Sequence, residues 1–235
     1  MNRKIIALAV FLAAFTASLW LFLPYKPFID NIISATEKNT GMSWEYDSSD
    51  DGIFYTRYYD VKINGRETGD VSFSHNPLML LRKKIRVTST GIYNTDAVMS
   101  EDSVRFTLET AGQAMDYISK PVRFEGRVYL EGFLTATEAP SELRAQIAKA
   151  IMTTPIGELA FENVTASVEI KGNMINVLSL KATGKTELNM SGTVHLDKRH
   201  PAMSDVQLTG TAGVLGIRKN MTLKGTVGNL HPIFN

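Results

Sequence analysis

One strand pattern, written four times, most constrains what this chain can fold into. It occupies residues 122–130 (VRFEGRVYL), 188–196 (LNMSGTVHL), 206–214 (VQLTGTAGV) and 221–228 (MTLKGTVG). In each copy an apolar residue fills every second position, and a glycine takes the middle place of that same series. A period of two indicates β-strands with one apolar face. The positions that define this face are Val122, Phe124, Gly126, Val128, Leu188, Met190, Gly192, Val194, Leu208, Gly210, Leu223, Gly225 and Val227.

A glycine inside a strand loses side-chain packing and costs roughly 0.5–1 kcal/mol relative to alanine. Four such glycines at matched positions therefore suggest a shared geometric cause. One interpretation is a bulge or kink that lets a long sheet coil strongly. The other is close approach, either of a covering helix or of an apolar ligand such as an acyl chain. Both predict a mainly β fold, with one curved, largely antiparallel sheet in a trough-like meander.

The rest of the chain contains further strands and two expected short helices. Residues 61–73 alternate on both sides of the turn NGRETG, and residues 164–180 alternate on both sides of Lys171-Gly172-Asn173. We expect one helix around 111–118. The segment 138–154 gives the clearest helix signal, because Leu143, Ile147 and Ile151 fall four apart and Pro155 follows.

The N-terminus predicts a membrane anchor. Residues 5–23 carry no charge, and as a helix they would nearly cross a hydrocarbon core of about 30 Å. Residues 1–4 contain Arg3 and Lys4, which places this tail in the cytoplasm and the remainder across the membrane. A signal peptide cleaved near Ala17 is the alternative, but its apolar region would usually be shorter, about 7–15 residues.

Residues 24–41 read as a juxtamembrane helix or linker, and residues 42–235 as the β-rich domain beyond the membrane. Phe28, Ile32 and Ile33 fall on one side of this helix, and Gly41 can end it. Packing against the domain and lying on the bilayer surface are both compatible with the pattern.

Composition and motifs exclude several function classes. The 25 basic and 24 acidic residues give a net charge of +1, which argues against nucleic acid as a partner. Cysteine is absent, so disulfides and cysteine-bound zinc are excluded. Neither His195-x-Asp197-x-x-His200 nor the calcium-like DSSDDG at 47–52 matches a metal signature, and no catalytic motif occurs. We therefore expect no enzyme activity, metal or cofactor.

The densest basic cluster consists of Arg82, Lys83, Lys84 and Arg86. On a strand, Ile85 and Val87 would point inward while the cationic side chains point outward. The simpler interpretation is a solvated sheet edge that discourages pairing with other chains. The alternative is contact with anionic phospholipid head groups near the anchor.

The run GELAFENVTASVEIKGNMINVLSLKATGKTELNMSGTVHLDKRHPAMSDVQLTGTAGV, at 157–214, resembles the type II secretion system protein N family. The likeness rests on Lys171-Gly172, Gly184, Ser191-Gly192 and Ser204, on the single N-terminal span and on NPLMLL at 76–81. The C-terminal part of that family is similar to AsmA-like domains. The resemblance implies a non-catalytic bacterial inner-membrane protein with a periplasmic domain that assists secretion. The AsmA-like part implies a trough-shaped sheet whose apolar concave face holds lipid.

Two functions of different classes follow. The chain is either a scaffold that contacts secretion-system proteins, by adding a strand at its sheet edge, or a protein that shields phospholipid acyl chains. A scaffold should fill the space opposite the four glycines with bulky side chains. A lipid carrier should leave an open apolar groove of several hundred Å³.

Overall fold

The computed structural model describes residues 25–115, 122–137, 139–154, 157–184, 186–197, 199–214 and 217–234. The expected span at 5–23 lies outside these residues, and none of the helices within them has the length and apolarity needed to cross a membrane. The fold is mainly β with antiparallel strand pairing, as the sequence predicted. The chain divides into two compact units, with the boundary between Gly91 and Ile92.

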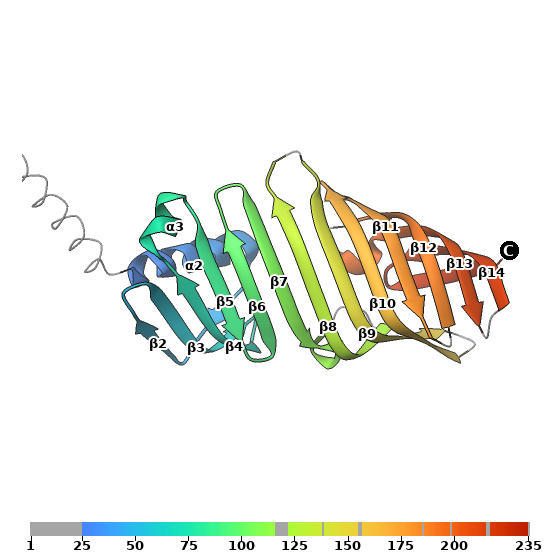
Figure 1. Ribbon diagram of the computed structural model, residues 1–235, viewed down its shortest axis with the longest axis horizontal. Coiled ribbons are helices and arrows are strands. Elements are labelled where there is room, and N and C mark those ends of the chain that lie inside the picture. The colour runs from blue at the N-terminus through green and yellow to red at the C-terminus, as the bar shows by residue number, and fades with distance from the viewer. Residues whose placement is uncertain are drawn as a thin grey trace, which may run out of the picture. The chain divides into compact units, whose positions relative to one another are not determined.

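The first unit is a small sheet with two α-helices (Figure 1). In it β3 pairs with β4 and β4 with β5, while β1 and β2 both pair with β3. Its elements are α2 (Lys26–Thr40), β1 (Trp44–Glu45), β2 (Ser48–Asp51), β3 (Tyr55–Ile63), β4 (Arg66–Ser74), α3 (Pro77–Leu81) and β5 (Ile85–Thr90). The calcium-like stretch 47–52 is thus mostly a strand, not a loop.

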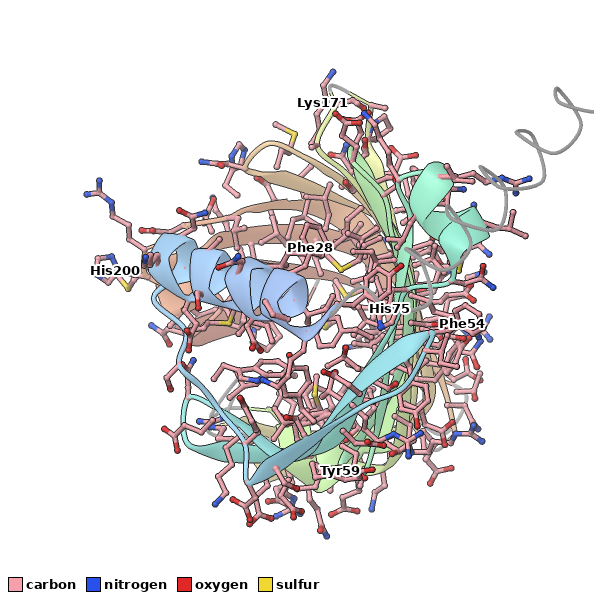
Figure 2. All side chains as sticks on the ribbon, turned by 90° about the vertical axis from the view of Figure 1, so that its left-hand side faces the viewer. Phe28, Phe54, Tyr59, His75, Lys171 and His200 are labelled. Atoms are coloured by element: carbon pink, nitrogen blue, oxygen red, sulfur yellow. The ribbon has the colours of Figure 1, made fainter. Side chains whose placement is uncertain are left out.

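Helix α2 covers one face of this sheet. Ile29 is 1% exposed and packs against Tyr58, Val61 and Phe73, so the helix buries the side that carries Ile29. Phe28 points away and stays exposed (Figure 2). The juxtamembrane helix expected from the sequence therefore packs on its own domain in this structure.

The second unit is a meander in which every strand pairs with its neighbour in the sequence (Figure 1). Its strands are β6 (Tyr93–Met99), β7 (Ser103–Ala111), β8 (Val122–Thr135), β9 (Ser141–Thr154), β10 (Gly157–Lys171), β11 (Met174–Thr183), β12 (Thr186–His195), β13 (Asp205–Val214), β14 (Ile217–Thr226) and β15 (Asn229–Phe234). Two short 3-10 helices, η1 (Gly112–Met115) and η2 (Pro201–Met203), lie between strands.

The helix predicted over 138–154 is wrong. Residues Ser141–Thr154 form strand β9, which pairs with β8 on one side and with β10 on the other. Two ladders of backbone hydrogen bonds thus satisfy a segment whose intrinsic preference is helical, and tertiary pairing overrides that preference. The helix expected at 111–118 is replaced by the end of β7 and by η1 over the part that the structure describes.

A line of irregular positions crosses β8, β9 and β10. Gly126 and Arg127 of β8 stand opposite Ala148 alone in β9, which makes a β-bulge. In β10, Asn163 stands opposite Ala148 and has a φ of +47°, in the left-handed region. The register shifts again between β10 and β11, where Asn163 and Val164 stand opposite Ala182 alone.

Candidate functional site: the apolar face of the second unit

The second unit has one charged face and one apolar face. Cross-strand ion pairs lie on the charged face, where Lys149 Nζ is 2.7 Å from Glu125 Oε2 and Arg144 Nη1 is 3.5 Å from Glu131 Oε1. The Lys149 ammonium, together with Arg123, lowers the pKa of Glu125. Alternate residues of the same strands carry the apolar side chains to the other face.

On β11–β14 the apolar face is packed tightly. Met190 is 2% exposed, and Leu208 and Leu223 from the two following strands are 5% and 8% exposed. Partly buried side chains, Leu188, Val194 and Val227 among them, pack against this cluster. The predicted face positions of β12–β14 therefore come together, and they form a filled core rather than an open groove.

The glycines of these strands sit where a neighbouring backbone comes close. A β-carbon placed on Gly192, whose φ is +151°, would lie 2.2 Å from the carbonyl oxygen of Gln207. On Gly210 it would lie 2.0 Å from the carbonyl oxygen of Asn189, and on Gly225 2.3 Å from that of Asn229. Adjacent strands, not a ligand or a helix, thus occupy the space that a side chain would need.

Gly126 serves the bulge on β8. Its φ is +76°, in the left-handed region that favours glycine, and an added β-carbon would lie 2.9 Å from that of Ala148. Beyond the bulge, Val122 and Phe124 pack with Phe161 and Ala150 in a second cluster. Val128, on the other side, is buried.

The same face is only partly buried on β7–β9. We call this part the apolar strip, and it is made of Phe106, Leu108, Leu130, Leu143 and Ala145. Register places these residues side by side, with Leu108 opposite Leu130 and Leu130 opposite Ala145. The ring of Phe106 lies over Gly132, where a β-carbon would approach within 2.7 Å.

The two ends of the apolar strip differ. At one end η1 folds over the face, and the Tyr93 hydroxyl donates a 3.0 Å hydrogen bond to the carbonyl of Ala114. Val128 and Thr110 are buried there. At the other end Met99 and Leu134 are exposed, at 41% and 38%. The strip is therefore closed at one end and open at the other.

Sequence reasoning missed the β9 contribution to this face. Leu143, Ala145 and Ile147 alternate as in a strand, but the four-residue spacing of Leu143, Ile147 and Ile151 favours a helix. The alternation itself was the signal that would have placed them here.

Three shallow hollows mark the unit, and polar and apolar residues together line each of them. One of about 410 Å³ lies at the bulge line, beside Arg127, Tyr129, Gln146, Asn163 and Thr165. Two others, of about 260 and 390 Å³, lie over β11–β13, next to side chains such as Lys181, Asn189 and Thr211. The lining of these hollows is mixed, whereas the groove that the sequence suggested would be lined by apolar side chains alone.

The basic cluster belongs to the first unit. Arg82, Lys83 and Lys84 are exposed in the turn that follows α3, and Arg86 is exposed on β5. Ile85 and Val87, on either side of Arg86, pack against the core cluster under α2.

In the His195-x-Asp197-x-x-His200 motif, Asp197 stabilises the loop that follows it. Asp197 accepts hydrogen bonds from the backbone amides of His200 and Arg199, at 3.0 and 2.8 Å, and these bonds lower its pKa. Within the described ranges no group of three or more histidine, aspartate or glutamate side chains is arranged to hold a metal ion.

The fold defines this chain as a mainly β protein built from antiparallel meanders. Comparison with protein-family models, with curated proteins and with solved structures finds no significant match in any of the three.

Proposed function

We propose that this chain is a non-catalytic protein, anchored in the bacterial inner membrane, whose periplasmic second unit shelters an acyl chain of a phospholipid on the apolar strip. The observation that carries the proposal is that none of the strip's side chains is fully buried, whereas Met190, Leu208 and Leu223 on the continuation of the same face are buried. A folded protein normally covers such a row of large apolar side chains or uses it for binding.

The strip suits a chain-like apolar ligand. Its residues come from three adjacent strands, and the CH₂ groups of one acyl chain could lie across all three. Each buried CH₂ contributes about 0.8 kcal/mol, so a long acyl chain gains enough to offset its loss of freedom. The end near Met99 and Leu134 is open, which would leave a polar head group in water.

A second candidate is an accessory role in type II secretion, in which the chain contacts other secretion-system proteins. The resemblance of residues 157–214 favours it, and so does the packed apolar cluster on the face of β11–β14. Among the described strands β15 pairs with β14 alone, which makes it the candidate edge for such a contact.

Native mass spectrometry of the full-length chain, released from phospholipid nanodiscs, tests the first proposal. We expect bound phospholipid, and we expect L108Q and L130Q to lower its occupancy at least about tenfold, because each places an amide in the apolar contact. L178Q is the control, since Leu178 is 53% exposed on β11.

Equal lipid occupancy in all variants would contradict the acyl-chain proposal. Affinity purification in mild detergent tests the second candidate at the same time. Recovery of inner-membrane secretion components or the secretin, without stoichiometric lipid, would favour the scaffold.

A further inference from the structure

Three segments of the first unit meet where α2 begins. The rings of Tyr25 and His75 stack with centroids 4.1 Å apart, and the backbone amide of His75 donates a 2.8 Å hydrogen bond to the carbonyl of Phe54. Figure 2 shows His75 and Phe54 close together in this unit. The next residue, Asn76, starts α3 by accepting a 2.9 Å hydrogen bond from the amide of Leu78. The start of α2, the β2–β3 turn and α3 are thus tied at one place.

This place exposes large apolar side chains. Leu78 and Leu81 of α3 are 70% and 72% exposed, and Ile53 and Phe54 of the β2–β3 turn are 55% and 46% exposed. We call these four residues the leucine patch. Four such side chains around one short helix and one turn form a surface that is usually covered in the working protein.

Charged residues border the leucine patch. Arg82, Lys83 and Lys84 follow α3 directly, and the amide of Lys84 returns to the carbonyl of Met79 at 2.8 Å, which holds this turn against the helix. On the other side, at the end of β2, lie Asp50 and Asp51. The cations therefore collect on the α3 side of the patch, next to Leu81.

The sequence before Tyr25 indicates what could cover this surface. Tyr25 follows residues 5–23 after a single proline, and those 19 residues carry no charge. A segment of that length and apolarity is expected to cross a bilayer. The leucine patch therefore lies beside the residue at which the chain leaves its expected anchor.

We propose that the leucine patch docks on the surface of an anionic phospholipid bilayer. The apolar side chains enter the boundary between head groups and acyl chains, and Arg82, Lys83 and Lys84 lie at the lipid phosphates. The inference rests on the membrane anchor of the proposed function, not on the apolar strip. It makes α3 a second attachment point, which fixes the orientation of the first unit on the membrane.

The absence of cysteine gives a direct test. Full-length L78C, carrying an environment-sensitive fluorophore, is reconstituted into vesicles of phosphatidylcholine and phosphatidylglycerol. We expect blue-shifted emission and a loss of about half of the intensity when lipids with a nitroxide quencher are included, since the label would sit near the acyl boundary. L178C on β11 is the matched control and should stay unquenched.

A label at A13C separates this inference from the anchor itself. Quenching at position 13 without quenching at position 78 would overturn the docking proposal and leave the anchor intact. No quenching at either position would overturn both the docking proposal and the membrane anchor. Quenching at position 78 supports the docking proposal, whatever position 13 shows.

The charges are tested in the same assay. The pair R82Q and K84Q, added to L78C, should reduce quenching at least about twofold in anionic vesicles, because two contacts to phosphate are lost. The pair K219Q and K224Q, both on β14, removes the same charge elsewhere and should change nothing. Equal quenching in purely neutral vesicles would contradict the role of the three cations.

Discussion

The hydroxyl of Tyr58 on β3 donates a 2.6 Å hydrogen bond to Oδ1 of Asp30 on α2. The other carboxylate oxygen, Oδ2, receives the Lys26 ammonium at 2.8 Å. Desolvation raises the pKa of Asp30, but the bonds from Lys26 and Tyr58 outweigh it, so the pKa is lowered overall. Burial, and then Asp30, raises the pKa of Tyr58. This bond fixes the helix on its sheet at the end nearest the expected anchor.

Tyr58→Phe should therefore destabilise the first unit. A hydrogen bond to a charged group contributes about 1.5–3 kcal/mol, and Asp30 is partly solvated, so we expect a loss near 1–2 kcal/mol. Denaturant unfolding of the full chain in detergent measures the change. Tyr59→Phe is the control, because Tyr59 is its half-exposed neighbour on the other face of β3. Equal effects of the two substitutions would contradict the proposed role of the bond.

His75 predicts a pH dependence. Burial lowers the pKa of His75, whose Nε2 is 3.4 Å from Thr56 Oγ1, while Asp51 acts in the opposite direction. The unfolded histidine, with a pKa near 6.5, takes up a proton first as pH falls. The stability that comes from keeping His75 neutral is therefore present in full above about pH 6.5. It falls as the pH drops below 6.5, and the loss is complete once the pH passes below the pKa of His75 in the folded protein.

We expect the free energy of unfolding to fall by about 1 kcal/mol more between pH 7.5 and 5.5 in the native chain than in His75→Gln. His195→Gln is the control, since His195 is exposed on β12. A pH profile that His75→Gln leaves unchanged would show that another group is responsible.

Gly192→Val tests the packed face. The new side chain would collide with the backbone of β13 and require an unfavourable φ, so we expect a loss of about 2–4 kcal/mol. Gly210→Val should act similarly through the backbone of β12. Thr193→Val places the same side chain next door and should change stability by less than about 0.5 kcal/mol. If the glycine variants kept full stability and lost only bound lipid, the strands would form a groove instead.

Asn163→Val tests the bulge line. Asn163 has a φ of 47°, which asparagine tolerates and a β-branched residue does not. We expect a loss of about 1–2 kcal/mol, measured by thermal or denaturant unfolding. Thr165→Val, on the exposed face of the same strand, is the control. Asn163→Gly should be close to neutral, and a large loss there would point to a side-chain contact rather than to backbone conformation.

The sequence predicted the fold class because apolar and polar residues alternate clearly in most strands. It failed at β9, and the bulge explains why. Leu143, Ala145 and Ile147 follow one alternation, whereas Ala150 and Met152 follow another, shifted by one residue at Ala148. A window across that point no longer shows a period of two, and the four-residue spacing of Leu143, Ile147 and Ile151 then resembles a helix.

The candidate site was less predictable than the fold. Periodicity shows that a residue faces the apolar side, but it does not show what covers that side. Met190 and Leu130 both lie on the apolar face of copies of the same strand pattern, yet Met190 is buried and Leu130 is only partly buried. The leucine patch was also hidden, because the sequence does not show the hydrogen bond between His75 and Phe54 that joins the two segments carrying it.

The order of strands in the second unit has a consequence for how the chain is made. Each strand from β7 onwards pairs first with the strand just before it, so nearly all pairings close short loops. Contacts between sequence neighbours form fast, and they do not wait for the C-terminus. A chain threaded across a membrane from its N-terminus can therefore fold as it emerges, one hairpin after another. At every moment of that process the most recent strand is the growing edge.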